Sequence, residues 1–390
     1  MFGLSAGVIV HKSHFGILLV TGGMTHQEGY ARGFQADPRC KIVGLTDELD
    51  VNQRRAHLNR ELAIQLGVPL LPNLDTALEI ADVDAVSVCS EFERRARVSE
   101  KCVRAGKHLY VDKPMATTVE DARSVVKAVA QEGVHSQMFT QVGQPYAQRA
   151  KAIVEAGTLG ELRSIHCDLL FAKGYARGVK LGQPRREHYP PKDFTFPDAK
   201  REVWTTAVYS LTLINYLTGR PIRSVYAKTE NYFFEEHSNR DVEDFGVLAL
   251  TLEGGITATI IASRIGWHSY RSFGPNLTRL YGNKGSVLID AHRPRWDIAS
   301  DRPEWTPPPR DPLDPMGFWA STMDRAQARP RTDWYSPQTM PAVSDQSLFL
   351  DCLEKNENAI ISATVAAHAS EVMLAAYRSA ATGKVVDLNR

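Results

Sequence analysis

Short apolar runs alternate with amphipathic stretches through the first third of the chain, and no other feature constrains the fold as much. Five short segments are predicted to be strands, and the most apolar of them suit strands buried on both faces; they lie at 16–22, 41–47, 84–90, 107–114 and 135–141. Helical patterns separate them; they lie at 26–36, 52–66, 94–106 and 118–131, with a short helix after Asn73. Such alternation is typical of a parallel sheet covered on both faces. The sequence therefore predicts a doubly wound α/β domain over residues 1–143.

The pattern changes after residue 144, where strands follow one another without helices between them. The predicted elements are a helix at 145–156, a strand at 161–172, a loop at 173–200, a helix at 205–219, and strands at 223–231, 243–253, 255–264, 277–282 and 286–291. Gly254 and Gly255 mark a hairpin turn. We expect an α+β domain with a large open, mainly antiparallel sheet over 144–390. We expect 292–343 to be mostly irregular. The closing helices at 345–355 and 362–381 could pack against the first domain.

Composition excludes several classes of partner. The 390 residues are too many for one ordinary core, and 46 basic against 45 acidic residues give a formal net charge of +1. A chain so balanced has no electrostatic footprint for nucleic acid or an anionic membrane. No apolar stretch reaches the roughly 18 residues of a membrane span. The N-terminus lacks a basic region before its apolar run, and the five cysteines form no CxxC pair; we therefore expect a cytoplasmic protein with reduced thiols.

The turn after the first strand is a degenerate version of a phosphate-binding loop. It reads Thr21-Gly22-Gly23-Met24-Thr25-His26-Gln27. Of the three glycines of a GxGxxG fingerprint, only Gly22 is in place. One interpretation is that residues 22–26 bring their backbone against a pyrophosphate at a helix N-terminus. The other is a tight strand-to-helix turn without a ligand, and the loop by itself does not decide between them. The candidate cofactor residues here are Gly22, Gly23, Met24, Thr25 and His26.

Asp47 strengthens the interpretation as a Rossmann-type dinucleotide site. It ends the second strand about 25 residues after Gly22, where an acidic side chain typically binds the ribose hydroxyls. Glu48 and Asp50 follow it, with no basic residue beside it in the sequence. This favours NAD over NADP, although Arg54 and Arg55 keep NADP open. The alternative role for Asp47 is to cap the helix over 50–66, and the two roles are compatible.

Lys113 follows a strand of buried type and precedes Pro114. Because proline forces the preceding residue into extended geometry, it fixes where the lysine leaves the strand. An ammonium at this position could bind a substrate hydroxyl, stabilise the alkoxide formed as hydride leaves, and share in proton transfer. The alternative is a structural lysine paired with Asp112.

The segment AGKHLYVDKP, which ends on these residues, resembles the AGKHV-x-x-EKP signature of the Gfo/Idh/MocA oxidoreductase family (glucose-fructose oxidoreductase and inositol dehydrogenase relatives). The resemblance extends over nearly the whole chain, through KIVGLTD, EAGTLGEL, YLTG and AAYRSAATGKVVDL. It implies an NAD(P)-dependent oxidoreductase without a metal. It also implies a homodimer or homotetramer formed through the C-terminal sheet.

Departures from the family pattern lie at the expected reaction centre. Asp112 stands where the family has glutamate. Aligning Leu217 and Gly219 on the family's L-x-G places Tyr209 at the position of its usual histidine. A tyrosine also occurs there in some relatives, and a phenol beside an ammonium can give or take a proton. The resemblance further implies cofactor contacts from the loop after the third strand, where Ser90, Glu91 and Arg95 stand, Arg95 in place of a histidine.

Candidate substrate residues lie after the last Rossmann strand and before the second-domain helix. An aromatic ring beside hydrogen-bonding groups suits a sugar or polyol. We select Gln144, Tyr146, Arg201, Trp204 and Thr205, with Gln141 as a further cofactor residue. Residues 235–244 form a loose acidic cluster, for which we favour a solvated loop over a metal site.

Three functions remain open from the sequence. We favour an NAD(P)-dependent oxidoreductase that transfers a hydride between nicotinamide and a hydroxyl or keto carbon of a sugar, glycoside or cyclitol, with Lys113 and Tyr209 handling the proton. A second is NAD-dependent glycoside cleavage by transient oxidation and elimination. A third is a non-catalytic dinucleotide-binding sensor, which the missing glycines favour.

Overall fold

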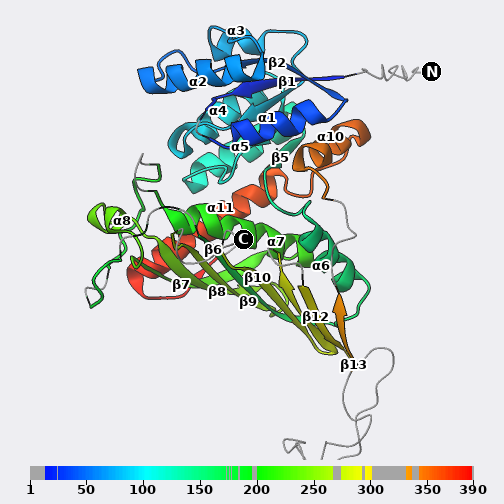
Figure 1. The fold of residues 1–390 in the computed structure, drawn as a ribbon, viewed down its shortest axis with the longest axis vertical. Coiled ribbons are helices and arrows are strands. Elements are labelled where there is room, and N and C mark those ends of the chain that lie inside the picture. Colours follow the sequence, from blue (N-terminus) through cyan, green and yellow to red (C-terminus); the bar gives the residue numbers. More distant parts are fainter. Residues whose placement is uncertain are drawn as a thin grey trace, which may run out of the picture. The chain divides into compact units, whose positions relative to one another are not determined.

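The protein is described from a computed structural model, which divides into two compact units (Figure 1). Unit 1 comprises residues 1–116, 120–139 and 344–363, and unit 2 comprises 117–119, 140–343 and 364–390. The structure describes residues 14–388 except for residues 24, 173, 175, 177, 183–184, 196–199, 267–273, 292–294, 301–330 and 336–341.

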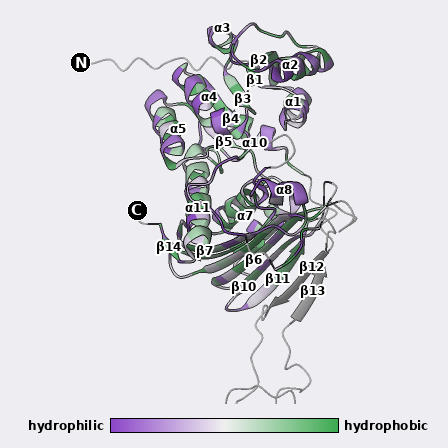
Figure 2. Cartoon of the chain, turned by 90° about the vertical axis from the view of Figure 1, so that its left-hand side faces the viewer, coloured by the Kyte–Doolittle hydropathy of each residue, from purple (hydrophilic) through white to green (hydrophobic). Residues whose placement is uncertain are grey.

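Unit 1 is built around a five-stranded parallel sheet with strand order β2-β1-β3-β4-β5. Its elements are β1 (Phe15–Val20), α1 (Gln27–Ala36), β2 (Cys40–Thr46), α2 (Gln53–Leu66), α3 (Leu74–Leu78), β3 (Ala85–Val88), α4 (Phe92–Arg104), β4 (His108–Val111), α5 (Val119–Glu132), β5 (Ser136–Met138) and α10 (Asp345–Lys355). Helices α1, α2 and α10 lie on one face and α4 and α5 on the other, and hydrophobic residues concentrate in the strands between them (Figure 2). The predicted doubly wound α/β fold of this region is confirmed.

Helix ends in unit 1 follow from local side-chain chemistry. Asn52 accepts a hydrogen bond from the backbone N–H of Arg55 and so caps α2, which ends at Gly67 in the left-handed conformation. Asn73 caps the short helix α3 in the same way. These caps fix the connections that lead into the carboxyl ends of the strands, where the candidate site lies.

Unit 2 contains a nine-stranded sheet with strand order β13-β12-β11-β10-β6-β9-β8-β7-β14. Its elements are α6 (Pro145–Glu155), β6 (Leu162–Phe171), α7 (Glu202–Thr218), β7 (Ile222–Glu230), α8 (Glu235–Asn239), β8 (Phe245–Leu252), β9 (Thr257–Arg264), β10 (Asn276–Gly282), β11 (Gly285–Asp290), β12 (Arg295–Ser300), β13 (Arg331–Tyr335), α11 (Ala363–Thr382) and β14 (Val386–Asp387). Only β6 and β9 pair in parallel among these strands as described, so the sheet is mainly antiparallel, as predicted. Gly254 and Gly255 both have positive φ in the turn between β8 and β9, as a hairpin turn requires.

Two parts of unit 2 differ from the sequence prediction. Residues 292–343 were expected to be mostly irregular, but β12 and β13 pair there and extend the sheet. Neither strand contains a proline, so the many prolines of this region flank the ladder instead of interrupting it. The acidic segment 235–244 was expected to be a loop and instead begins with helix α8. No helix in the described parts of the chain has both the length and the apolar character of a membrane span.

Candidate functional site

The carboxyl ends of the parallel strands of unit 1 lie at one edge of the sheet, where doubly wound domains bind ligands. Gly22 and Gly23 follow β1, and Asp47 follows β2. The loop after β3 supplies Ser90 and Glu91 to the same edge. The two groups of side chains that dominate this edge are centred on Asp47 and on Asp112.

The glycine turn after β1 is packed against α2. The N–H of Gly22 donates to Oδ1 of Asn59 over 2.8 Å, and a Cβ on Gly22 would lie only 3.0 Å from the Asn59 Cα. A Cβ on Gly23 would lie 3.0 Å from the carbonyl oxygen of Leu58. A larger residue at either position would press on α2, so both glycines suit the close approach of this helix. The sequence left open whether these glycines serve a tight turn or a pyrophosphate. Packing against α2 explains both glycines as parts of a tight turn.

Thr25 caps the first backbone N–H of α1, that of Gln27. Oγ1 of Thr25 donates to the Gly22 carbonyl over 2.7 Å and accepts from the N–H of Gln27 over 3.0 Å. His26 is the N-cap residue, but its side chain turns to Asp112 instead of capping the helix. Met24 lies outside the described residues.

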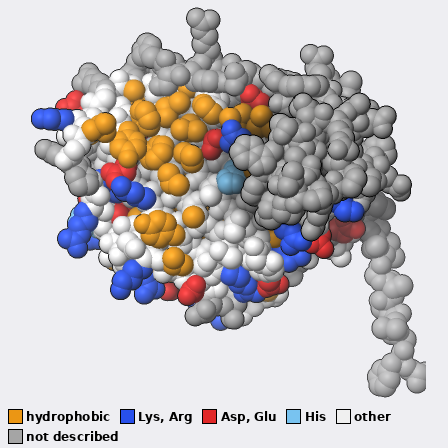
Figure 3. All heavy atoms as spheres, turned by 90° about the horizontal axis from the view of Figure 1, so that it is seen from below, with side chains coloured by type: hydrophobic (Ala, Val, Ile, Leu, Met, Phe, Trp, Pro, Cys, Tyr) orange, Lys and Arg blue, Asp and Glu red, His pale blue; other side chains and the backbone are white. Residues whose placement is uncertain are grey.

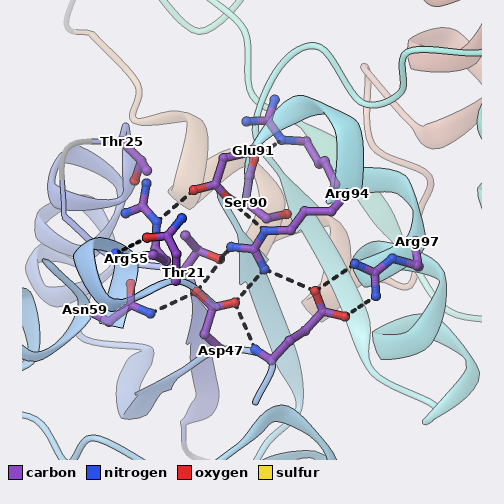
Figure 4. Close-up of polar contacts among 12 residues, drawn as sticks. Thr21, Thr25, Asp47, Arg55, Asn59, Ser90, Glu91, Arg94 and Arg97 are labelled. Atoms are coloured by element: carbon purple, nitrogen blue, oxygen red, sulfur yellow. Dashed lines mark hydrogen bonds and ion pairs between the residues drawn. The ribbon is translucent and has the colours of Figure 1, made fainter. Parts of the chain in front are cut away.

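Asp47 is almost completely buried, and its carboxylate is bound to Arg94 of α4 (Figure 4). Oδ1 accepts from Nη1 of Arg94 over 2.6 Å and from the Glu48 N–H over 2.9 Å. Oδ2 accepts from Nη2 of Arg94 over 3.2 Å and from Nδ2 of Asn59 over 2.8 Å. The sequence showed no basic residue beside Asp47, but folding brings one there from 47 positions away.

Arg94 also reaches the loop after β3. Its Nε donates to Oε2 of Glu91 over 2.6 Å, and its Nη2 donates to Oγ1 of Thr21 over 3.0 Å. Arg55 approaches Glu91 from α2, over 2.8 Å. Burial alone would raise the pKa of Glu91, but the charges of Arg94 and Arg55 outweigh it and lower the pKa below its ordinary value. Glu91 is therefore an anionic link between two arginines.

A cavity of about 370 Å³ opens beside this network. Its lining comes from the segments after β2 and β3, the places where an adenosine ribose would lie in a doubly wound domain. The lining residues are Glu48, Asp50, Val51, Asn52, Arg55, Glu91, Glu93, Arg94 and Arg97. The buried Oγ of Ser90, at the end of β3, has no hydrogen-bond partner among the residues described. The carboxylates and guanidiniums that line the cavity fit the ribose end of a dinucleotide once Asp47 exchanges one of its partners, whereas Ser90 is completely buried and does not line the cavity.

Asp112, at the end of β4, is the centre of the second group. Its Oδ1 accepts from the hydroxyl of Tyr30 over 2.6 Å, the N–H of Lys113 over 2.8 Å and Nδ1 of His26 over 2.9 Å. Burial alone would raise its pKa, but the positive charges of His26, Arg95 and Lys113 outweigh burial and hold the pKa of Asp112 well below its usual value. The carboxylate therefore stays charged and fixes the backbone from which Lys113 projects.

Arg95 was expected to contact the cofactor and is instead an internal brace. Only 2% of its side chain is exposed. Its three nitrogens donate to the Ser90 carbonyl over 2.9 Å, the Pro114 carbonyl over 2.8 Å and Oδ2 of Asp112 over 2.9 Å. With every nitrogen committed to the protein, Arg95 positions the strand end that carries Lys113.

Comparison with known families bears on both units. A model described as an oxidoreductase family with an NAD-binding Rossmann fold matches residues 15–140, and a model of the GFO/IDH/MocA C-terminal domain matches residues 147–288. Together these ranges cover more than half of the chain. The chain belongs to the Gfo/Idh/MocA family. The resemblance first seen in AGKHLYVDKP is thereby confirmed.

Individual members of the Gfo/Idh/MocA family are only distantly similar. The chain is 24% identical over 214 residues to the uncharacterized oxidoreductase YrbE of Bacillus subtilis, covering 55% of this chain and 57% of that one. It is 26% identical over 245 residues to inositol 2-dehydrogenase 2 of Saccharopolyspora erythraea, covering 57% and 64%. The chain thus spans about three fifths of these relatives. The fold matches an NAD-binding protein from Listeria innocua with a TM-score of 0.69 at 18% identity, over 97% of this chain and all of that one.

Some of the sequence-predicted residues of unit 2 remain candidates for a site. Tyr209 lies on α7, with its ring edge-on to Phe171 at the end of β6. The hydroxyl of Tyr146 donates to Oε1 of Gln141 over 2.9 Å, so these two candidates contact each other. Gln144 precedes α6 as its N-cap residue and makes no side-chain cap.

The remaining substrate candidates have structural partners instead. Arg201 is buried and donates to Glu243 over 2.7 Å. The ring of Trp204 is fully buried and stacks on Tyr377 with centroids 5.6 Å apart. Thr205 donates to the carbonyl oxygen of Glu202, one turn earlier in the helix. Packing inside unit 2 accounts for all three, and none of these contacts points to a ligand.

The acidic segment 235–244 is not the solvated loop that the sequence favoured. Glu243 and Asp244 are completely buried. Asp244 accepts hydrogen bonds from the backbone N–H groups of Tyr232, Phe233 and Phe234. Within the described ranges, no three His, Cys, Asp or Glu side chains are arranged to hold a metal ion. The segment is a structural element of unit 2.

Sequence reasoning missed Arg94 and Asn59, the two side chains that bind Asp47. Arg94 is adjacent to a residue that was selected, and it stands in the first turn of the helix after β3. That position was the available signal, because side chains there face the carboxyl ends of the strands. Asn59 lies in mid-helix and has no comparable signal.

Proposed function

We propose that the protein is an NAD(P)-dependent oxidoreductase that moves a hydride between nicotinamide and a hydroxyl or keto carbon of a sugar, glycoside or cyclitol. The observation that carries this proposal is the fixed presentation of Lys113 by Asp112 and Arg95 in a chain of the Gfo/Idh/MocA family. The similarity to a protein named inositol 2-dehydrogenase 2 supports a polyhydroxylated substrate.

Several residues of unit 1 are proposed to hold the dinucleotide, which supplies the hydride acceptor or donor. The turn from Gly22 to His26 lies at the start of α1, and Ser90 and Glu91 lie at the end of β3. Asp47 would bind the ribose after exchanging a partner. The resemblance also implies a cofactor contact from Gln141.

Lys113 and Tyr209 are proposed to handle the proton. During oxidation the carbon loses a hydride while its hydroxyl loses a proton, so negative charge develops on the oxygen. Lys113 would hydrogen-bond that oxygen and stabilise its charge, and Tyr209 would give or take the proton. Gln144 and Tyr146 remain the proposed substrate contacts.

The test replaces Lys113 with alanine in the full chain. We expect kcat/KM with a panel of sugars and cyclitols to fall by about 10³-fold or more, because charge stabilisation and proton transfer are lost together. Dinucleotide affinity by calorimetry and the unfolding midpoint should stay close to wild type. Lys101→Ala on the surface of α4 is the matched control and should keep full activity. Wild-type-like turnover in Lys113→Ala would overturn the assignment.

One observation favours a second candidate, a non-catalytic dinucleotide sensor. Asp47 is already bound to Arg94, so cofactor affinity has an internal competitor. A sensor would bind NAD or NADP saturably and show no hydride transfer with any member of the substrate panel. Turnover that depends on Lys113 would exclude this candidate.

We also propose that the protein forms a homodimer or homotetramer through the open face of the unit 2 sheet. Hydrophobic side chains gather over this face (Figure 3). Tyr226, Val247 and Tyr281 are among its exposed apolar residues, and monomers rarely leave such patches uncovered. Light scattering should give a mass above that of one 43.4 kDa subunit, and Val247→Asp should lower it. A wild-type mass of one subunit would contradict this proposal.

The cytoplasmic location stays a prediction. All five cysteines are free thiols in the structure, in keeping with a reducing compartment. Cell fractionation with an antibody against the protein would test it.

A further inference from the structure

The carboxylate of Asp47 has no hydrogen-bonding capacity left. An ionised carboxylate offers about four lone-pair positions, two on each oxygen. Arg94 fills two of them, and the Glu48 N–H and Asn59 Nδ2 fill the other two. A ribose hydroxyl can therefore donate to Asp47 only if one of these donors leaves.

Arg94 is equally saturated. A guanidinium has five N–H donors in a fixed fork. Nε binds Glu91, Nη1 binds Asp47 and Glu48, and Nη2 binds Asp47 and Thr21. Neither the ribose acid nor its counter-ion is available to a ligand while they remain paired.

Arg94 is the donor best placed to leave. The Glu48 N–H is part of the backbone, and Asn59 is held by its second bond to the Gly22 N–H. The Arg94 side chain is 16% exposed and lines the 370 Å³ cavity, whereas the side chain of Asp47 is 4% exposed. If Arg94 swings towards the cavity, two acceptor positions of Asp47 open together.

The ion-pair network beside the cavity is balanced in charge, although Asp50 and Glu93 also line the cavity. Three carboxylates and three guanidiniums form the network: Asp47, Glu48 and Glu91 with Arg55, Arg94 and Arg97. An isolated Asp47 would repel the 2′-phosphate of NADP. Arg94 removes that repulsion and, once displaced, offers planar N–H groups that match a phosphate.

We propose that Arg94 sets the choice between NAD and NADP by standing in for the ribose on Asp47 in the free protein. With NAD, the exchange gives Asp47 new hydroxyl partners but leaves the N–H groups that Arg94 withdraws without an anion. With NADP, the same groups gain the 2′-phosphate. Arg94 therefore penalises NAD and favours NADP. This inference rests on the proposed dinucleotide function.

The experiment titrates NAD and NADP separately into the full chain and into Arg94→Ala, by calorimetry. We expect the affinity for NAD to rise about tenfold, because hydrogen bonds of this kind contribute about that factor. The affinity for NADP should fall about tenfold or more, because a charge-assisted contact is lost and Asp47 is left unneutralised. The ratio of the two affinities should thus change by about a hundredfold.

Arg97→Ala is the matched control. Arg97 lines the same cavity and binds Glu48, but its side chain is 63% exposed and does not contact Asp47. We expect its loss to change both affinities less than about threefold, as for an exposed ion pair. If Arg97→Ala changes the NADP/NAD ratio as much as Arg94→Ala does, the specific role of Arg94 is wrong.

A second variant guards against a folding defect. Arg94→Lys keeps the charge but cannot bridge Asp47, Thr21 and Glu91 at once. It should raise the affinity for NAD while retaining most of the affinity for NADP. If the wild-type chain binds both dinucleotides and neither variant changes their ratio, the inference is overturned. If the wild-type chain binds neither, the proposed dinucleotide function itself fails.

Discussion

The ends of β2 and β4, which β1 and β3 separate in the unit 1 sheet, each carry an ion pair between an aspartate and an arginine, and the two pairs have different roles. Asp47 after β2 binds Arg94, and Asp112 after β4 binds Arg95. Both aspartates are almost completely buried, and both arginines come from the first turn of α4. At β4 the pair fixes the backbone of the residue that follows, because Asp112 accepts a hydrogen bond from the Lys113 N–H. At β2 the pair occupies the group that a ligand would use.

Exposure separates the two pairs. The Arg95 side chain is 2% exposed and holds two backbone carbonyls besides Asp112. Arg94 faces a cavity and binds no backbone group in the described structure. Separating a fully buried pair leaves an uncompensated charge in the interior, whereas a pair at a cavity can exchange its partner with a ligand or water. The Arg95–Asp112 pair is therefore suited to positioning Lys113, and the Arg94–Asp47 pair is suited to exchanging a partner with a ligand.

The largest effect expected from this contrast is on stability. Arg95→Ala should lower the free energy of unfolding by about 3–5 kcal/mol, because Asp112 and two carbonyl groups lose a buried partner. Denaturant unfolding of the purified chain measures this. Arg104→Ala, which removes an exposed pair with Glu100 on the same helix, should cost about 0.5 kcal/mol or less. A greater loss in Arg94→Ala than in Arg95→Ala would contradict the distinction between the two pairs.

An intermediate effect on stability is expected at Asn59, which binds Asp47 and not Asp112. Asn59→Ala should lower the free energy of unfolding by about 2–3 kcal/mol, because the buried N–H of Gly22 and one Asp47 oxygen both lose their partner. The N-cap variant Asn52→Ala, on the same helix, should cost about 1 kcal/mol. Equal losses in the two variants would show that the glycine turn does not depend on Asn59.

The smallest effect is on stability at acidic pH, and it concerns Asp112 at the end of β4. Since the folded pKa of Asp112 lies well below its usual value, the unfolded chain takes up a proton there below about pH 4 that the folded chain does not. This contribution to stability is present above that pH and is lost as the pH falls. Asp112→Asn should remove up to about 1.4 kcal/mol per pH unit of that slope, measured by unfolding at a series of acidic pH values.

Asp112→Glu is the comparison for this measurement. It keeps a titrating carboxyl, and glutamate is the residue that the family signature has at this position. We expect it to retain most of the acid slope. If Asp112→Asn and Asp112→Glu show the same slope, the carboxyl at the end of β4 does not carry this part of the pH dependence.

The order of elements could be predicted from the sequence because it depends on local patterns. Apolar runs and caps such as Asn52 and Asn73 define the elements of unit 1 from neighbouring residues alone. Strands β12 and β13 were missed because each is short and lies among prolines, and its only support is its partner strand. Pairing between distant segments leaves little trace in local composition.

The candidate site shows the same limit. Asp47 and Lys113 could be selected because each stands at a recognisable strand end. The bond between Asp47 and Arg94 depends on how α4 is rotated over the sheet, which no local pattern specifies. Trp204 was misread for a related reason: an aromatic residue beside polar ones suits a sugar site and a packed core equally well, and its stacking partner Tyr377 lies far along the chain.

Arg94 and Arg95 are consecutive residues, so a single turn of α4 carries both ion pairs. A ligand that draws Arg94 away from Asp47 acts on the same helical turn that holds Asp112 in place. If dinucleotide binding changes the pKa of Asp112 through this turn, thermodynamic reciprocity requires that protonation of Asp112 change the dinucleotide affinity by the same factor. Cofactor binding and the positioning of Lys113 would then depend on each other through this turn of α4.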